Sequence, residues 1–208
     1  MSGVTVRLAV LLGLTAALAG CGGASLIKAE DPPTIDDTIP AAEVTRHWQV
    51  DLGADTPPDY RLEPALSDDR VFAAAADGTV MAFDADTGER QWQVSLDVTI
   101  TGAVGVGDEG VAVGTADAEV ILMDTDDGAV QWQRSVSSEI LAPPAVGQGS
   151  VVVRTGDGGV FALDAASGQQ RWLYRRNVPA LSLRGHAAPV LVNGGVVAGF
   201  DNGRLSAL

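Results

Sequence analysis

The stretch VFAAAADGTVMAFDADTGERQWQVSL, which starts at Val71, decides the fold because its pattern returns at a constant spacing. The stretches VAVGTADAEVILMDTDDGAVQWQRSV from Val111 and VVVRTGDGGVFALDAASGQQRWLYRR from Val151 align with it without gaps, each 40 residues further on. A fourth copy begins as VVAGFDNGRLSAL at Val196, after a spacing of 45 residues. Repeats of this length are typical of proteins that are built from stacked or radially arranged units.

Each copy predicts three β-strands, and an apolar run upstream of it predicts a fourth. The first strand, such as Val151 to Arg154, is rich in β-branched residues, and we expect a two-residue turn such as Asp77-Gly78 to follow it. The upstream runs are Ile100 to Val106, Ile140 to Val146 and Ala187 to Val192. Four strands in 40 residues describe one blade of a β-propeller, so we predict an all-β propeller of four-stranded blades.

Three kinds of residue recur once in each copy. They are Asp84, Asp124 and Asp164; Gly88, Gly128 and Gly168; and Trp92, Trp132 and Trp172, with Trp48 as a further match. We expect the glycines to supply a positive φ at a turn and the aspartates to accept bonds from nearby backbone amides. The tryptophans are expected to be buried between neighbouring blades. A residue that recurs in every blade serves the architecture, so none of these is predicted to stack on a cofactor.

The two ends of the repeat array suggest how a ring would close. HWQVDLG, at residues 47–53, copies the outer-strand pattern QWQVSL, and we expect it to complete the last blade. Leu208 falls one residue before the aspartate of the fourth copy, which predicts a fragment of roughly half a ring. The expected propeller region is 47–208, with blades at about 62–96, 100–136 and 140–176 and a partial blade at 187–208.

The N-terminus predicts a secretory signal over residues 1–20, with Arg7 before a short apolar run. Leu18 to Cys21 resembles a bacterial lipobox, which implies cleavage before Cys21 and a lipid with acyl chains such as palmitate on its sulfur. An ordinary secreted protein with a chance cysteine is the alternative. Gly22 in place of Asp implies transport to the outer membrane. Residues 21–46 then form an extended, acidic tether.

Composition argues against several classes of function. The chain has 27 Asp and Glu against 13 Lys and Arg, a formal net charge of -14, which excludes the basic footprint of a nucleic-acid binder. The histidines, His47 and His186, show no metal-ligand spacing, and no nucleophile elbow, phosphate loop or Cys-x-x-Cys is present. Asp124, Asp126 and Asp127 lie in an expected hairpin turn, and a calcium site there is the less favoured alternative. We predict no catalytic residue and no cofactor.

The stretch AFDADTGERQW at Ala82 to Trp92 resembles the signature of pyrroloquinoline-quinone-type propeller repeats. ALDAASGQQRW matches it with Ser167 for threonine, whereas LMDTDDGAVQW departs from it at two positions. The resemblance implies the fold and says little about function. A fragment of a periplasmic quinone-dependent dehydrogenase stays open as an alternative, although the paired cysteines and calcium site of those enzymes are not found in this sequence.

The lipobox, the acidic tether, the repeats and the longer connection PALSLRG at Pro179 to Gly185 together resemble the BamB family, lipoprotein subunits of the β-barrel assembly machinery. The resemblance implies that Leu181, Leu183 and Arg184 face BamA, the central barrel subunit, at its periplasmic POTRA domains. Arginine beside aliphatic residues is a common composition for an interface hot spot. The alternative is that both leucines pack on the third blade and that Arg184 is a solvated charge.

The function that this resemblance implies is that of a non-catalytic scaffold of the Bam complex. It would be anchored by lipid on the periplasmic face of the outer membrane and would help the assembly and insertion of β-barrel proteins. Unfolded outer-membrane proteins are a further candidate partner. Another periplasmic binding propeller is the remaining alternative.

Overall fold

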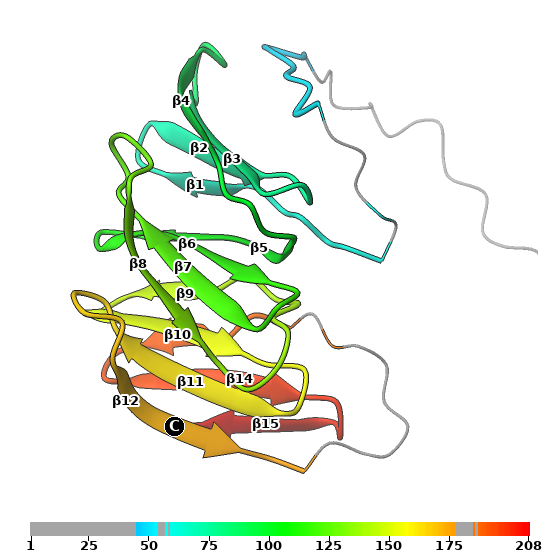
Figure 1. Cartoon of the computed structure of the whole chain (residues 1–208), viewed down its shortest axis with the longest axis vertical. Helices are drawn as coiled ribbons and strands as arrows, with labels where there is room; N and C mark the ends of the chain where they lie inside the picture. Colours follow the sequence, from blue (N-terminus) through cyan, green and yellow to red (C-terminus); the bar gives the residue numbers. More distant parts are fainter. Residues whose placement is uncertain (1–44, 54–56, 58, 178–184, 186) are drawn as a thin grey trace, which may run out of the picture. The chain divides into compact units, whose positions relative to one another are not determined.

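The described residues form fifteen β-strands and no helix, which confirms the all-β prediction (Figure 1). The structure is a computed structural model, and it describes residues 45–53, 57, 59–177, 185 and 187–208. The strands all lie in the unit Thr45–Leu208. Among these residues no helix is present that could span a membrane.

The strands form four antiparallel sheets that follow one another along the chain. The first contains β1 (Ala65–Ser67), β2 (Arg70–Ala74), β3 (Thr79–Asp84) and β4 (Arg90–Ser95). The second contains β5 (Ile100–Gly107), β6 (Gly110–Thr115), β7 (Glu119–Met123) and β8 (Val130–Ser135). The third contains β9 (Ala145–Gly147), β10 (Ser150–Arg154), β11 (Gly159–Asp164) and β12 (Gln170–Arg175). The fourth contains β13 (Val190–Val192), β14 (Gly195–Phe200) and β15 (Arg204–Ala207).

The order of strands within each sheet is the order of the chain, as expected for propeller blades. The register slips at the same place in each complete blade, between Ala82 and Phe83 in the first and at the equivalent pairs of the next two. The repeated sequence therefore encodes a repeated structure down to the position of a bulge. We call the four sheets blades 1 to 4.

The blades are held together by apolar clusters that lie between neighbours. Phe72 and Val80 of blade 1 share a cluster with Val111 and Val113 of blade 2, and all four are fully buried. Similar clusters join blade 2 to blade 3 and blade 3 to blade 4. Because each inner blade packs on both faces, its middle strands are buried almost throughout: every residue of β6 is buried. The outer strand β8 is mostly exposed.

The turn between β2 and β3 is longer than the predicted two-residue turn. The last paired residues are Ala74 and Val80, and the Ala75 N–H donates to the Thr79 carbonyl. Gly78 closes the turn at φ +93° and donates to the Ala75 carbonyl. The Asp-Gly pair is thus the second half of a turn that ends in a glycine bulge, a common longer hairpin connection.

The turn between β3 and β4 is built around the recurring aspartate. The Asp84 carboxylate accepts bonds from the Thr87 N–H (2.8 Å) and the Thr87 hydroxyl (2.7 Å). These bonds lower the pKa of Asp84. The Gly88 N–H donates to the Asp84 carbonyl, and Gly88 has a φ of +72°. The same arrangement recurs at Asp164, where a serine replaces the threonine.

Three of the four recurring tryptophans reach across to the turn of the next blade; Trp92 and Trp132 are buried as predicted, whereas Trp48 and Trp172 are half-buried. The indole N–H donates to the carbonyl of a residue in that turn: Trp48 to Ala85 (2.9 Å), Trp92 to Thr125 (2.9 Å) and Trp132 to Ala165 (2.7 Å). The ring lies on the turn glycine, so that a Cβ added at Gly88, Gly128 or Gly168 would meet the Trp ring at 2.7–2.9 Å. Each contact therefore joins two successive blades by packing and by one directional bond, and we call it the Trp–turn joint.

Residues 47–53 lie outside the strand ladders of the described residues. Trp48 nevertheless occupies the same place against blade 1 that Trp92 occupies against blade 2. The segment is thus held where the outer strand of a preceding blade would lie. Its pairing with the last blade of a ring stays a prediction.

We predict that the glycine of the Trp–turn joint is required mainly for space. Gly128→Ala should lower the free energy of unfolding by about 2–5 kcal/mol, for two reasons. The added methyl group would lie 2.9 Å from the Trp92 ring, and alanine is strained in the left-handed backbone conformation of this position. The measurement is urea denaturation followed by tryptophan fluorescence.

The matched control is Gly194→Ala, since Gly194 has a φ of +77° and nothing within 4 Å of an added Cβ. It should lose only the backbone component, about 1–2 kcal/mol. Equal losses in the two variants would mean that contact with the indole ring does not matter.

Candidate partner-binding site

The residues that the sequence singled out for partner binding lie outside the described part of the chain. These are Leu181, Leu183 and Arg184, and the same holds for the predicted lipid site, Cys21. The described residues on either side are Arg176 and Asn177 before the long connection and Gly185 within it. The candidate site is therefore built from the joint between blade 3 and blade 4, where this connection leaves and returns.

The long connection leaves blade 3 as its shorter counterparts leave blades 1 and 2. The N–H groups of Leu96, Val136 and Arg176 each donate to the carbonyl of the turn between the second and third strands of their own blade. The three residues are therefore equivalent. Leu96 and Val136 pack against the apolar clusters, whereas the third position carries a charge.

Where the long connection enters blade 4, a small residue stands at a position that is large in the shorter connections. Ile100 and Ile140 are fully buried where the shorter connections enter the next blade. Allowing for the five extra residues, Gly185 takes the equivalent place. It lies so close to Arg154 and Asp201 that an added Cβ would clash with both side chains.

The position that faces Gly185 changes in the opposite sense, from a small residue to a large one. Blade 1 has Ala74 and blade 2 has Gly114 where blade 3 has Arg154. An added Cβ at Gly114 would clash with Ile140. A bulky isoleucine beside a small residue is thus replaced by a bulky arginine beside a glycine, which conserves volume and introduces a charge.

Arg154, which is buried, and Asp201 form a partly buried ion pair that joins blade 3 to blade 4. The guanidinium Nη2 lies 2.7 Å from the carboxylate, and the side chains are 5% and 15% exposed. The guanidinium also lies over the Phe200 ring, 5.9 Å from its centroid. Its Nε has no partner among the described residues. Desolvation makes such a pair a weak source of stability compared with an apolar contact. Its value lies in fixing one geometry at this joint.

Two aromatic side chains and a second arginine extend the site. Tyr174 lies 6.0 Å from Phe200 between ring centroids, and Arg176 Nε donates to the Tyr174 hydroxyl at 2.9 Å. Hydrogen bonding from Ser206, followed by that from Arg176, lowers the pKa of Tyr174. The site therefore presents an aromatic platform with positive charge beside it.

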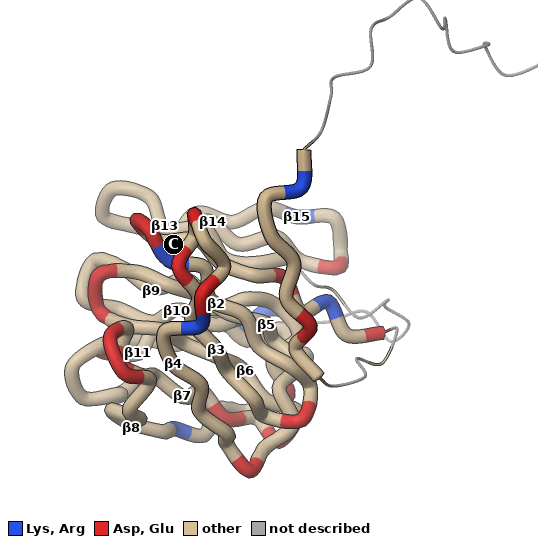
Figure 2. The backbone as a smooth tube through the Cα atoms, turned by 90° about the horizontal axis from the view of Figure 1, so that it is seen from above, with Lys and Arg blue, Asp and Glu red and all other residues tan. Residues whose placement is uncertain are grey.

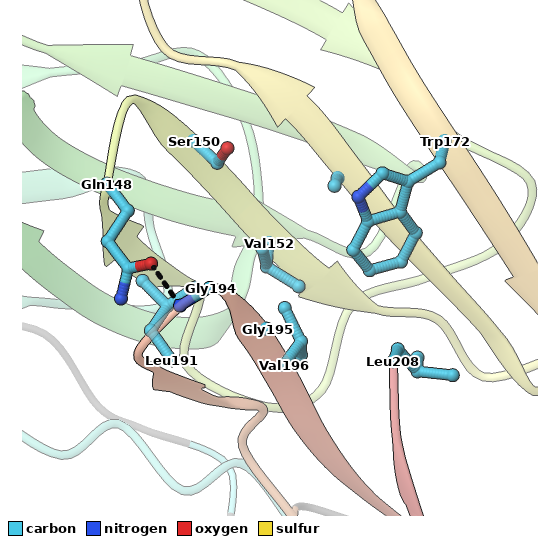
Figure 3. Close-up of a pocket in the computed structure, with 10 residues that line it drawn as sticks. Gln148, Ser150, Val152, Trp172, Leu191, Gly194, Gly195, Val196 and Leu208 are labelled. Atoms are coloured by element: carbon cyan, nitrogen blue, oxygen red, sulfur yellow. Dashed lines mark hydrogen bonds between the residues drawn. The ribbon is translucent and has the colours of Figure 1, made fainter.

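The Trp–turn joint differs at this place because Trp172 lines a cavity. The cavity has a volume of about 300 Å³, and Leu191, Val196 and Leu208 form its apolar wall (Figure 3). At the end away from Trp172, beside Leu191, Gln148 accepts a hydrogen bond from the Gly194 N–H at 3.3 Å. Among the described residues no acceptor lies within hydrogen-bonding distance of the Trp172 indole.

Acidic residues gather in the turns at the ends of the blades (Figure 2). Asp124 accepts a bond from the Asp126 N–H, Asp126 pairs with Arg70, and Asp127 accepts from Ala129 N–H. These carboxylates therefore build the turn and its contact with blade 1. Within the described ranges no group of three or more potential ligands is arranged to hold a metal ion.

The sequence alone did not point to Arg154 or Asp201. The signal was nevertheless present, because an arginine stands where two copies have Ala and Gly, and Asp201 stands where they have Ala76 and Ala116. Departures from a repeat are as informative as its matches. The pairing itself could not be foreseen, since the two residues lie in different blades.

Four-stranded blades with an Asp-centred turn and a Trp–turn joint define a propeller with pyrroloquinoline-quinone-like repeats. A sequence profile described as "Outer membrane protein assembly factor BamB" matches residues 39–101 and 76–208. The chain belongs to this family. The family is named for assembly and not for a reaction, in agreement with the prediction that the chain is not an enzyme.

Individual relatives support the same assignment. BamB of Alkalilimnicola ehrlichii is 56% identical over 97% of this chain and 52% of its own length. BamB of Pseudomonas aeruginosa is 39% identical over 48% of this chain and 26% of its own length. The crystal structure of BamB from Moraxella catarrhalis matches with a TM-score of 0.64 and 32% identity, covering 71% of this chain and 44% of that one. The chain thus spans about half the length, or less, of the relatives that it matches.

We predict strong coupling between Arg154 and Asp201. Arg154→Met should lower the free energy of unfolding by about 1–3 kcal/mol, because it leaves a partly buried carboxylate unpaired. Arg154→Met combined with Asp201→Ala should recover most of that loss. The joint would then resemble the apolar joints between blades 1 and 2 and between blades 2 and 3. Urea denaturation of the two single variants, the double variant and the parent chain provides the double-mutant cycle. Additive effects would show that the ion pair does not act as a unit.

Proposed function

We propose that this chain is part of a non-catalytic scaffold that helps to assemble β-barrel proteins into the outer membrane. The observation that carries the proposal is the 56% identity, over 97% of the chain, to a protein named outer membrane protein assembly factor BamB. The match includes the region that holds the long connection after blade 3. A stack of blades joined by apolar clusters suits a scaffold, because it holds surface segments in fixed relative positions.

The working surface of this scaffold is the connection between blades 3 and 4, with Leu181, Leu183 and Arg184 in contact with the partner. The partner is the central barrel subunit of the assembly machinery, BamA, bound at its periplasmic POTRA domains. The joint supports this proposal because its departures from the repeat occur once, at the connection that is also longer than the others. Binding would raise the local concentration of the periplasmic domains and orient them at the membrane, with no covalent chemistry.

Loss of these side chains is expected to abolish copurification of the barrel subunit. Leu181→Ala with Arg184→Ala removes the apolar anchor and the charge while leaving the blades intact. The measurement is affinity purification from detergent-solubilised membranes, followed by immunoblotting for the barrel subunit. Because relatives are about twice as long, the pair of substitutions is made in the full-length protein that contains this sequence.

A matched control uses the same residue types at another exposed place. Leu66→Ala with Arg90→Ala changes a leucine that is 67% exposed and an exposed arginine of blade 1. This variant should copurify the barrel subunit as the parent does. Unchanged copurification in the Leu181 and Arg184 variant would refute the proposed surface.

The scaffold is held at the periplasmic face of the outer membrane by a lipid on Cys21. The lipobox at Leu18 to Cys21 and the Gly at position 22 support this location. Two or more acyl chains would give stable anchoring, whereas a single chain gives only reversible binding. Residues 21–46 would then act as the tether.

Cys21→Ala should eliminate metabolic labelling with an alkyne analogue of palmitate and release the protein from the outer-membrane fraction. Fractionation on a sucrose gradient, with fluorescence detection of the label, measures both effects. Cys21 is the only cysteine in the sequence, so persistent labelling of the variant would exclude attachment through a thiol of this chain.

A further inference from the structure

The joint between blades 3 and 4 carries a positive charge at a position that is apolar elsewhere. Arg176 is equivalent to Leu96 and Val136, as their shared backbone hydrogen bond shows. Those two residues pack on the apolar clusters of their joints. Arg176 instead turns to Tyr174, with its guanidinium carbon 6.0 Å from the centre of the phenol ring and its Nε bonded to the hydroxyl.

A second arginine lies on blade 4 as the cross-strand partner of Phe200, whose ring packs on Tyr174. Arg204 begins β15, and its charge acts on Tyr174 together with that of Arg176. Tyr174 is half-buried, and it packs against the interblade cluster that includes Ala162 and Phe200. The ring is therefore a fixed platform, flanked by one guanidinium from each blade.

Neither arginine has an acidic partner among the described residues. The four ion pairs found there join Arg70 to Asp126, Arg154 to Asp201, Arg171 to Asp164 and Arg175 to Asp157. Asp201 and Asp157, the nearby carboxylates, are thus each engaged by another arginine. Arg90 and Arg134 also lack a carboxylate partner among the described residues, so what distinguishes Arg176 and Arg204 is their position beside one tyrosine at a single joint.

A small cavity beside Arg176 also indicates unpaired positive charge at this joint. It has a volume of about 10 Å³, enough for about one water molecule, and its wall includes Arg154, Arg176 and Asn202. Arg154 is 95% buried and its Nε is unsatisfied there. The Asp201 carboxylate in the same wall is engaged by Arg154, so that Arg176 is the cation there without an ion pair among the described residues.

We propose that Tyr174, Arg176 and Arg204 form a surface that binds a carboxylate-bearing segment of a partner protein. The proposal deepens the proposed function and rests on it for the identity of the partner, whose contacting segment it describes as acidic. Tyrosine and arginine are the residues most often found at interface hot spots. The remaining surface, with its net negative charge, repels an acidic segment, so the complementary patch would fix where and in what orientation the partner binds.

The test uses a fluorescein-labelled peptide of alternating Glu and Gly and the purified full-length protein that contains this sequence, expressed without residues 1–21, with fluorescence anisotropy at low and at physiological salt. Arg176→Leu with Arg204→Gln should weaken peptide binding about tenfold or more at low salt. Arg176→Leu restores the residue that blade 1 has at Leu96, so the variant should fold, and near-ultraviolet circular dichroism checks that it does.

The matched control is Arg90→Leu with Arg134→Gln, which removes the same net charge from arginines that also lack a carboxylate partner in the described structure. It should change peptide affinity by less than about twofold. Equal losses in the two variants, or no binding by the parent chain, would overturn the proposal. Vesicles that contain phosphatidylglycerol test the other anionic source: an effect of the Arg176 and Arg204 changes on vesicles but not on the peptide would also overturn it.

Failure of this proposal can be told apart from failure of the proposed function. The peptide measurement contains no barrel subunit, and the copurification measurement depends on Leu181 and Arg184. Peptide binding through Arg176 and Arg204 without copurification would leave the carboxylate surface and remove its named partner. Copurification without peptide binding would leave the named partner and remove the carboxylate-binding surface.

Discussion

The Trp–turn joint is the interaction on which the rest of the structure depends. An indole ring lies on a glycine of the next blade, and its N–H donates to the carbonyl three residues before that glycine, as Trp132 lies on Gly168 and donates to Ala165. Apolar packing alone is non-directional and would tolerate sliding between two flat sheets. The single bond at a fixed carbonyl sets the register of one blade on another. Because the contact recurs every 40 residues, each blade can be added by the same rule.

This repeated rule explains why the exceptional joint is informative. Between blades 3 and 4 the buried Ile and its small neighbour give way to Gly185 and Arg154, and the charge is balanced by Asp201 of the following blade. An apolar contact would serve stability at least as well. An ion pair with Phe200 beneath it adds directionality at the joint from which the longer connection leaves, so we interpret it as a device that fixes geometry beside the proposed working surface.

The repeat in the sequence was sufficient to predict the sheets, their strand order and the glycine and tryptophan contacts, because all of these depend on local spacing. It was insufficient for two features. The length of the β2–β3 turn depends on which glycine takes a positive φ, and the Asp77-Gly78 pair is compatible with more than one turn. The Arg154 and Asp201 pair depends on contact between blades, which no periodicity within a copy encodes. Both residues were visible only as departures from their equivalents in the other copies.

The distribution of charge follows from the same division between repeated and unique positions. Repeated aspartates such as Asp84 and Asp164 are used within turns, where they accept backbone bonds and add negative charge to every blade. These aspartates add to a surface that is acidic in composition, with 27 Asp and Glu in the sequence against 13 Lys and Arg. A binding surface for an acidic segment must therefore arise where the repeat is broken, as it is at Tyr174 and Arg176. The same background that keeps the chain from associating with acidic proteins in general also makes a small basic patch selective.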